Sequence, residues 1–156
     1  MKLLSDACEY ALRATVWLAQ QPQDFYTVGQ IAQATSAAPG YLVKVLQALA
    51  KAGILAARRG SQGGFQLTRP AAQLSVLDVI CAVDPPERIR TCPLGRGLHD
   101  KELCPLHRRI DQAIAALEQS FAQVTIQDLI AETSQSPAAC RALLAGSSIA
   151  IGSIEI

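Results

Sequence analysis

Apolar residues in the first half of the chain recur at the spacing of short helices. Near the N-terminus they lie three or four positions apart, which places them on one face of a helix that ends before Pro22. Asp6, followed three residues later by Glu9, predicts an N-cap and its capping-box partner. A second short helix is predicted over 27–35, and a third is closed by Gly53. The apolar residues of the first helix are Ala7, Ala11, Ala14 and Leu18, and those of the third are Tyr41, Leu42, Val45, Leu46 and Leu49.

Two short strand-like runs follow the third helix between positions 54 and 69. They flank a loop that contains Gly60, Gly63 and Gly64, and this pattern predicts a β-hairpin with a glycine-rich tip. Helix, tight turn and helix followed at once by a hairpin predict a winged helix-turn-helix. The fold class is therefore mainly α with a small β wing.

The second half of the chain predicts further helices around a loop. Ser75 and Asp78 form a capping box for a helix to about Val83, and Thr125 begins another short helix. Pro105 suits the first position of a long helix over 105–124. Its apolar stripe follows a complete small domain, which favours a subunit interface over packing on its own domain. The stripe consists of Leu106, Ile110, Ile114, Leu117, Phe121 and Val124.

Composition places the chain among cytoplasmic proteins. Half of the 156 residues are hydrophobic, yet no apolar run reaches the roughly 20 residues that span a bilayer, and we see no secretory signal. We therefore expect no contact with a membrane. In the cytoplasm the five cysteines are not expected to form structural disulfides. Cys81 and Cys140 lie in apolar helical contexts and are predicted to be buried.

Charge is distributed unevenly along a chain whose net charge is only +1. Between positions 25 and 77 there is no Asp or Glu, and the same stretch carries five basic residues. A basic stretch in a nearly neutral protein is typical of a polyanion-binding surface, although a solvated basic face would look the same. The basic residues are Lys44, Lys51, Arg58, Arg59 and Arg69.

Candidate chemistry is concentrated in the loop between the fourth helix and the long helix. Cys92, Cys104 and His107 lie in this Gly- and Pro-containing segment. Thiolate and neutral imidazole are ligands that zinc, copper and iron–sulfur clusters prefer. Three such ligands are one short of a closed site, so a metal would need a fourth donor from elsewhere.

These elements, in this order, resemble the Rrf2 family of bacterial transcriptional regulators, of the IscR- and NsrR-like kind. The resemblance covers roughly residues 1–132 and leaves the tail after about residue 145 without a counterpart. It implies a winged helix-turn-helix DNA-binding domain over 1–83, a Cys-containing sensor loop over 84–104, a dimerisation helix over 105–124, and C-terminal helices and a tail over 125–156. The segments that carry it are Tyr10–Arg13, Gly40–Leu46, Leu55–Leu67, Val76–Asp84 and Cys104–His107.

The resemblance implies a homodimer that binds double-stranded DNA at a palindromic operator. Helix-turn-helix dimers place two recognition helices about one helical turn of DNA apart. Third-helix residues are then expected at the major groove or its phosphates, and Arg59 of the wing at the minor groove. The other wing residues are weaker candidates. The glycines are included because they let the backbone approach a phosphate closely. The full set is Tyr41, Leu42, Lys44, Arg58, Arg59, Gly60, Ser61, Gln62 and Gly63.

The resemblance also implies a 2Fe–2S cluster that senses redox state, cluster status or nitric oxide. Cluster-binding members usually carry three cysteines in this loop, but Leu98 stands at the middle position here. Cys92, Cys104 and His107 match the remaining ligands. In some relatives a carboxylate of the other subunit's first helix completes the site, which points to Glu9, with Cys8 beside it. His99 is a further candidate.

Three other interpretations stay open. Cys92 and Cys104, with Arg90, Arg96 and Arg108 nearby to lower a thiol pKa, suit a cluster-free thiol-redox regulator. A zinc site would use the same ligands. The third interpretation is a protein-interaction adaptor that uses the winged helix for protein contacts. We do not expect an enzyme, because no oxyanion-hole motif, phosphate loop or paired catalytic carboxylates accompany the Cys and His residues.

Overall fold

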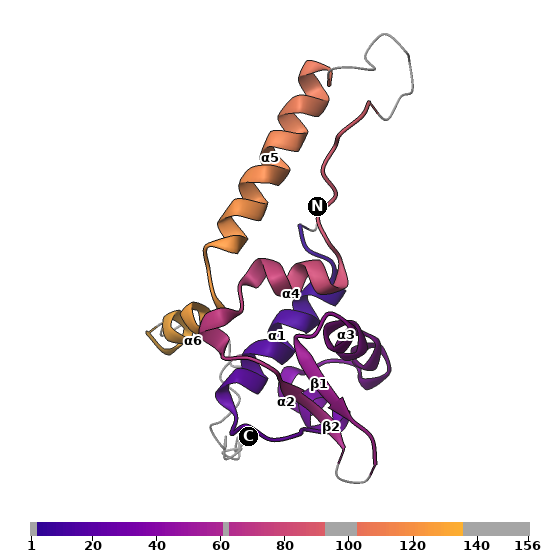
Figure 1. Ribbon diagram of the computed structural model, residues 1–156, viewed down its shortest axis with the longest axis vertical. Coiled ribbons are helices and arrows are strands. Elements are labelled where there is room, and N and C mark those ends of the chain that lie inside the picture. The colour runs from indigo at the N-terminus through magenta and orange to yellow at the C-terminus, as the bar shows by residue number, and fades with distance from the viewer. Residues whose placement is uncertain (1–2, 61–62, 93–102, 136–156) are drawn as a thin grey trace, which may run out of the picture.

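The described part of the chain, residues 3–60, 63–92 and 103–135 of a computed structural model, is mostly helical with one two-stranded sheet (Figure 1). This architecture agrees with the predicted fold class. In chain order its elements are α1 (Asp6–Gln20), α2 (Val28–Thr35), α3 (Pro39–Lys51), β1 (Leu55–Arg58), β2 (Gly64–Leu67), the 3-10 turn η1 (Ala71–Gln73), α4 (Val76–Val83), α5 (Pro105–Ala122) and α6 (Ile126–Gln135).

Helix α1 is the centre of the fold and begins differently from the prediction. Ser5, rather than Asp6, is the N-cap, and its side chain accepts a hydrogen bond from the Cys8 backbone N–H at 3.4 Å. Glu9 therefore has no capping-box role and instead pairs with Arg13, one turn along α1, at 3.3 Å. Ser and Asp are equally good N-caps, so two of them in a row leave the first residue of a helix ambiguous.

Apolar faces of α1, α2, α3 and α4 meet in one core. Helix α2 begins with a capping box between Thr27 and Gln30, and α3 begins with Pro39 at its first turn. The buried positions of α3 are three or four residues apart, as the sequence predicted for its apolar face. Side chains with no exposed area include Ala11, Ala14, Ile31, Leu42, Leu46, Leu49, Leu74 and Val79.

The wing is an antiparallel hairpin whose register runs from Leu55 opposite Leu67 to Arg58 opposite Gly64. Phe65 anchors it, because its side chain is buried and its backbone exchanges two hydrogen bonds with Tyr26. At the tip, Gly60 has φ of 103°, a conformation that favours glycine.

Two short segments, 74–76 at the start of α4 and 124–126 after α5, meet at a joint beside α6. The Val76 N–H donates to the Val124 carbonyl at 2.9 Å, and the Ile126 N–H donates to the Leu74 carbonyl at 2.8 Å. The predicted capping box of Ser75 is present, and Thr125 exchanges hydrogen bonds with Asp128 at the start of α6. Because Ile126 has no exposed area, α6 belongs to the same packed body as α1.

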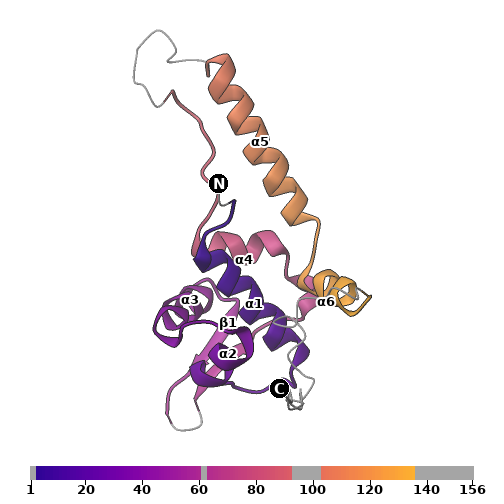
Figure 2. The ribbon, with the colours of Figure 1, turned by 180° about the vertical axis from the view of Figure 1, so that it is seen from behind.

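Helix α5 leaves this body and extends away from it, as Figures 1 and 2 both show. We call the packed body, residues 4–60, 63–83 and 124–135, the head, and α5 the arm. No residue of the arm is buried, and Leu106 and Ile110 of its predicted apolar stripe are 65% and 41% exposed. In the described residues no helix has the length and apolar character needed to cross a membrane.

One predicted burial is wrong, and several predictions fall outside the described residues. Cys81 lies on the exposed side of α4. Its thiol pKa is nevertheless raised, first by partial desolvation and then by the negative charges of Glu118 and Asp78. Cys140, the predicted helix near 138–144 and the C-terminal tail lie outside the described residues.

Candidate functional site

Two cysteine sulfurs converge on one imidazole nitrogen at the start of the arm. The Sγ of Cys104 lies 3.3 Å from Nδ1 of His107, and the Sγ of Cys92 lies 3.9 Å from the same atom. All three side chains are half-buried. The structure thus brings together the three residues that the sequence singled out, although Cys92 and Cys104 are twelve positions apart.

Local sequence explains why Cys104 and His107 meet. Cys104 is the N-cap residue of α5, and Pro105 occupies the first helical position. Residues three apart on a helix lie on the same face, so His107 returns to Cys104 within one turn. Cys92 arrives from the other direction, at the end of a segment that leaves α4 and runs beside the arm (Figure 1).

A charged cluster joins that segment to the arm. The guanidinium of Arg88 donates to both carboxylate oxygens of Asp111, each at 2.7 Å, and to Glu118 at 3.3 Å. The backbone N–H of Ile89 donates to the same Asp111 carboxylate at 2.9 Å. The hydrogen bonds from Arg88, the larger cause, and from Ile89 lower the pKa of Asp111, and the bonds to Asp111 and Glu118 raise the pKa of Arg88. Sequence reasoning missed this cluster, because an irregular segment paired with a distant helix has no periodic signal.

The donor set fits a thiolate- and imidazole-binding metal or cluster only in part. Tetrahedral bonds of about 2.3 Å to sulfur and 2.0 Å to nitrogen separate the two donors by about 3.5 Å, between the two observed distances. Among the residues that the structure describes, however, no three His, Cys, Asp or Glu side chains are already arranged as a metal-binding group. The site offers suitable donors, and a complete set of ligands needs one more.

The predicted fourth ligands differ in how accessible they are. Cys8 is 1% exposed, and its thiol lies 4.0 Å from the Asp84 carbonyl oxygen. The Glu9 side chain is 45% exposed. Both residues lie at the start of α1 on the head, whereas Cys104 begins the arm at the end remote from the head (Figure 1). Within one protomer neither joins the three donors, and His99 and Leu98 lie outside the described residues.

The predicted DNA-contacting residues of α3 divide into exposed and buried positions. Tyr41 is 43% exposed, with its ring edge-on to that of Tyr10 at a centroid distance of 5.7 Å, and Lys44 is exposed. The Leu42 side chain, in contrast, has no exposed area and packs in the core, which speaks against a side-chain contact with DNA. The periodicity of α3 already placed Leu42 on the apolar face.

The wing presents charge on a tightly turned backbone. Arg59 and Gly60 are exposed, and Arg58 lies over the Phe25 ring, 4.3 Å from its centroid. Gly63 is buried, and a Cβ there would collide with the Arg58 carbonyl, so glycine is required by backbone packing. Ser61 and Gln62 lie outside the described residues.

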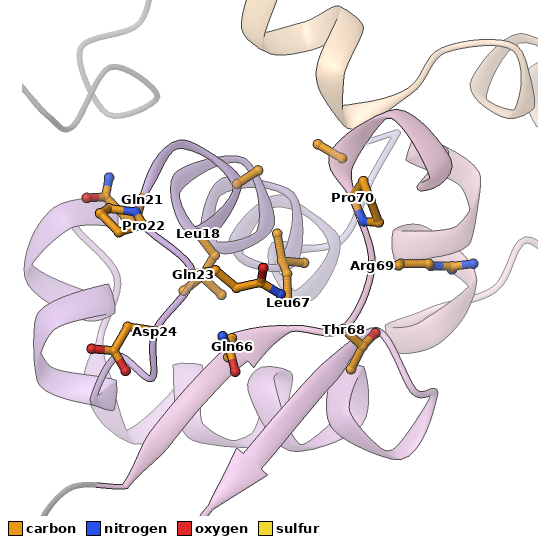
Figure 3. A pocket seen from close by; sticks show the side chains of 12 residues that line it. Leu18, Gln21, Pro22, Gln23, Asp24, Gln66, Leu67, Thr68, Arg69 and Pro70 are labelled. Carbon is orange, nitrogen blue, oxygen red and sulfur yellow. The ribbon is translucent and has the colours of Figure 1, made fainter.

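Two hollows lie away from the side chains of Cys92, Cys104 and His107. An apolar one of about 620 Å³ lies between the N-terminal residues, the end of α4 and the arm, with Leu3, Ile80 and Leu117 in its lining. A smaller one of about 280 Å³ lies between the end of α1 and β2 (Figure 3). Leu18, Gln23 and Leu67 gather at its centre, and Arg69 is directed away from it (Figure 3).

Comparison with known proteins gives one family and a set of similar folds. The sequence model of the Rrf2 family, described as iron-dependent transcriptional regulators, matches residues 4–132. IscR of T. potens is 20% identical, with a TM-score of 0.70 over 90% of this chain and 93% of that one. CymR of B. subtilis, described as its global cysteine regulator, is 19% identical, with a TM-score of 0.67 over 85% of this chain and 98% of that one. An oxidized form of CymR from Staphylococcus aureus is 23% identical, with a TM-score of 0.62 over 83% of this chain and 96% of that one.

Proposed function

The chain belongs to the Rrf2 family of transcriptional regulators, and from this premise we propose that it is a homodimeric regulator whose operator binding is controlled by a 2Fe–2S cluster. Members of the family bind DNA and typically act as dimers. The observation that carries the proposal is the approach of the Cys92 and Cys104 sulfurs to one nitrogen of His107. Two thiolates and an imidazole suit such a cluster, and nitrogen ligation raises its reduction potential.

The fourth ligand in this proposal is Glu9 of the second protomer. Its carboxylate is half exposed and free of a capping role, and its salt bridge to Arg13 is an exposed pair that is worth little. Cys8 is a poorer candidate, because its thiol is buried beneath the start of α1. A ligand from the partner's head would join the arm of one subunit to the head of the other.

The arm supplies the dimer interface in this proposal. It carries an apolar stripe with two strongly exposed members, and helices with an apolar stripe are stabilised when that stripe is covered. Each sensor centre lies at the start of an arm, so a change in its ligation would act on the helix that sets the separation of the two DNA-binding heads. Such a change shifts an existing equilibrium between arrangements of the dimer.

DNA binding in the proposal uses Tyr41, Lys44 and Arg59, which are all exposed. The two basic residues lie on α3 and on the wing, in the stretch that contains no acidic residue. If each subunit contacts three to four phosphates, the logarithm of the affinity falls with the logarithm of the salt concentration with a slope of roughly −5 to −7 for the dimer.

The cluster is tested on full-length protein purified without oxygen, by native mass spectrometry and absorption spectra. We expect coloured protein with one 2Fe–2S cluster per protomer, which is lost in His107→Ala and weakened in Glu9→Ala. Cys81→Ala is the matched control, because Cys81 is an exposed cysteine outside the site. Protein that stays colourless and free of iron after reconstitution would contradict the proposal.

The DNA interface is tested by mobility shift on the promoter beside the protein's own gene. We expect Lys44→Ala and Arg59→Ala each to weaken binding by about tenfold and to reduce the salt slope by about two for a dimer, since each removes one phosphate contact per subunit. Lys51→Ala, at the C-terminal end of α3, is the control and should have a smaller effect. Affinity that does not depend on salt would exclude this surface.

A cluster-free thiol switch is a second candidate, and the same sulfur contacts favour it. Both thiols approach one imidazole nitrogen, so a short movement would allow a Cys92–Cys104 disulfide. Hydrogen peroxide would accept the two electrons and two protons that the thiols release, and it would be reduced to water. Mass spectrometry of metal-free protein then shows a loss of two thiols under peroxide. An unchanged thiol count would exclude the switch.

A further inference from the structure

The segment between α4 and Cys92 has no helix or strand to hold its course. Among the described residues, its hydrogen bonds to the arm between positions 85 and 91 come from Arg88 and Ile89. Both go to Asp111, and Arg88 adds a contact with Glu118. An irregular segment with so few attachments depends on each of them for its position.

We propose that Arg88 is a positioning residue of the sensor centre, which fixes the segment on the arm through Asp111 so that Cys92 meets His107. The inference rests on the proposed function in one respect, that Cys92, Cys104 and His107 are the sensing groups. It goes beyond that function by assigning a role to two residues outside the site. We call the Arg88–Asp111 pair the clamp, and its role is to hold Cys92 beside His107.

The geometry of the arm supports this task. Asp111 follows His107 by four residues, so both lie on one face of α5 about 6 Å apart along the axis. The segment runs in the opposite direction, with Ile89 bonded to Asp111. Three further residues of extended chain cover about 10 Å, which is enough to bring Cys92 level with His107.

The chemistry of the Arg88–Asp111 pair suits a contact that fixes the position of the Cys92 segment along α5, and not only one that attracts the segment to the helix. A guanidinium that donates to both oxygens of a carboxylate is held in one plane, whereas a lysine would make a point contact. The Ile89 N–H adds a third bond to the same carboxylate, so the backbone is fixed as well as the side chain. The Asp111 side chain is only 18% exposed, which limits competition from water.

The clamp also connects the sensor centre to the proposed dimer interface. Ile110, a strongly exposed member of the apolar stripe, is the immediate neighbour of Asp111 on the arm. One stretch of α5 therefore carries the attachment of the Cys92 segment and the surface that we assign to the second protomer. A movement of the arm would change both together.

The test measures the proximity of the two thiols in full-length, metal-free, reduced protein. Dibromobimane links two nearby thiols into one fluorescent adduct, and peptide mass spectrometry identifies the pair. We expect Cys92 and Cys104 to be linked in the unmodified protein and the rate to fall about fivefold in Arg88→Gln, which removes the charge of a partly exposed ionic network. Arg88→Lys should restore part of the rate.

Glu118→Gln is the matched control, because it removes the outer contact of Arg88 and leaves the two Asp111 bonds in place. It should change the rate by less than twofold. The reaction of Cys104 with a monofunctional maleimide should stay the same in every variant, since Cys104 is held by α5 itself. A melting temperature equal to that of the unmodified protein shows that the head is folded.

The outcomes separate the clamp from the cluster. An Arg88→Gln protein that links Cys92 to Cys104 as fast as the unmodified protein overturns the clamp and leaves the cluster proposal intact. Protein that shows the expected linking pattern but stays free of iron after reconstitution overturns the cluster and leaves the clamp intact. Failure of the unmodified protein to form the link would overturn the clamp, and reconstitution with iron would still decide the cluster.

Discussion

The head and the arm are built from the same kinds of residue but use them in opposite ways. In the head, apolar residues of α1, α2, α3, α4 and α6 close on one another, and many have no exposed area. In the arm an equally regular apolar stripe runs over about four turns, from Leu106 to Phe121, yet no residue is buried. Because burial of apolar area is the main stabilising contribution to a fold, the head is expected to be stable by itself and the arm to depend on a partner.

The largest difference should appear when one leucine is truncated in each region. Leu46→Ala removes a fully buried side chain from the head and should lower the free energy of unfolding by about 2–5 kcal/mol. Leu106→Ala makes the same chemical change on the arm, where the side chain is 65% exposed, and should leave the melting temperature of the head unchanged. Chemical denaturation measures both. Equal losses would mean that the arm is packed in solution as tightly as the head.

The next effect concerns association rather than folding. Ile110→Asp places a charge in the apolar stripe of the arm and should raise the dissociation constant of the dimer by about a hundredfold, since a charge in an apolar interface is costly in both protomers. Sedimentation of the variant over a range of concentrations measures the change. A dimer of unchanged affinity would show that the arm is not the interface, whereas loss of the head's melting transition would point to misfolding instead.

A smaller effect is expected at the joint between the two regions. Asp128 accepts hydrogen bonds from the Thr125 side chain and backbone, and these bonds lower its pKa. A carboxylate whose pKa is lower in the folded protein stabilises the fold above its unfolded pKa, and this stabilisation is lost as the pH falls through the folded value.

Asp128→Asn should therefore lower the melting temperature slightly near neutral pH, and the difference from the unmodified protein should shrink as the pH falls below the ordinary pKa range of an aspartate carboxyl. Thermal melts at several pH values measure this. A difference that persists in acid would mean that Asp128 acts through packing and not through its charge.

Local signals in the sequence are sufficient to predict most of the helices and helix caps of the head. The capping box of Ser75 and the hydrogen bonds between Thr125 and Asp128 involve residues three apart, so the sequence predicts them directly. The spacing of Cys104 and His107 likewise brings them together on one helical turn. Ser5 was missed as the N-cap because Asp6, beside it, is an equally good one.

The errors and omissions share a different cause. Resemblance to a family assigns the exposed surface of the third helix to DNA as one segment, and Leu42 is included with its neighbours. Helical periodicity determines which side chains of that segment face outward, and the Leu42 side chain does not. The Arg88–Asp111 clamp joins an irregular segment to a helix 23 positions away, and neither partner belongs to a recognisable local pattern. Such contacts depend on the path of the chain, which periodicity does not determine.

The joint where Val76 meets Val124 and Ile126 meets Leu74 has a consequence for how this architecture can vary. The joint fixes the return of the chain beside the start of α4, so the stretch that leaves the head after Val83 and comes back at Val124 is a closed excursion. Doubling the length of such an excursion costs only about 0.6 kcal/mol in loop-closure entropy. Insertions and deletions between the two cysteines should therefore leave the head intact, and the architecture can accept sensor loops of very different length and chemistry on an unchanged DNA-reading unit.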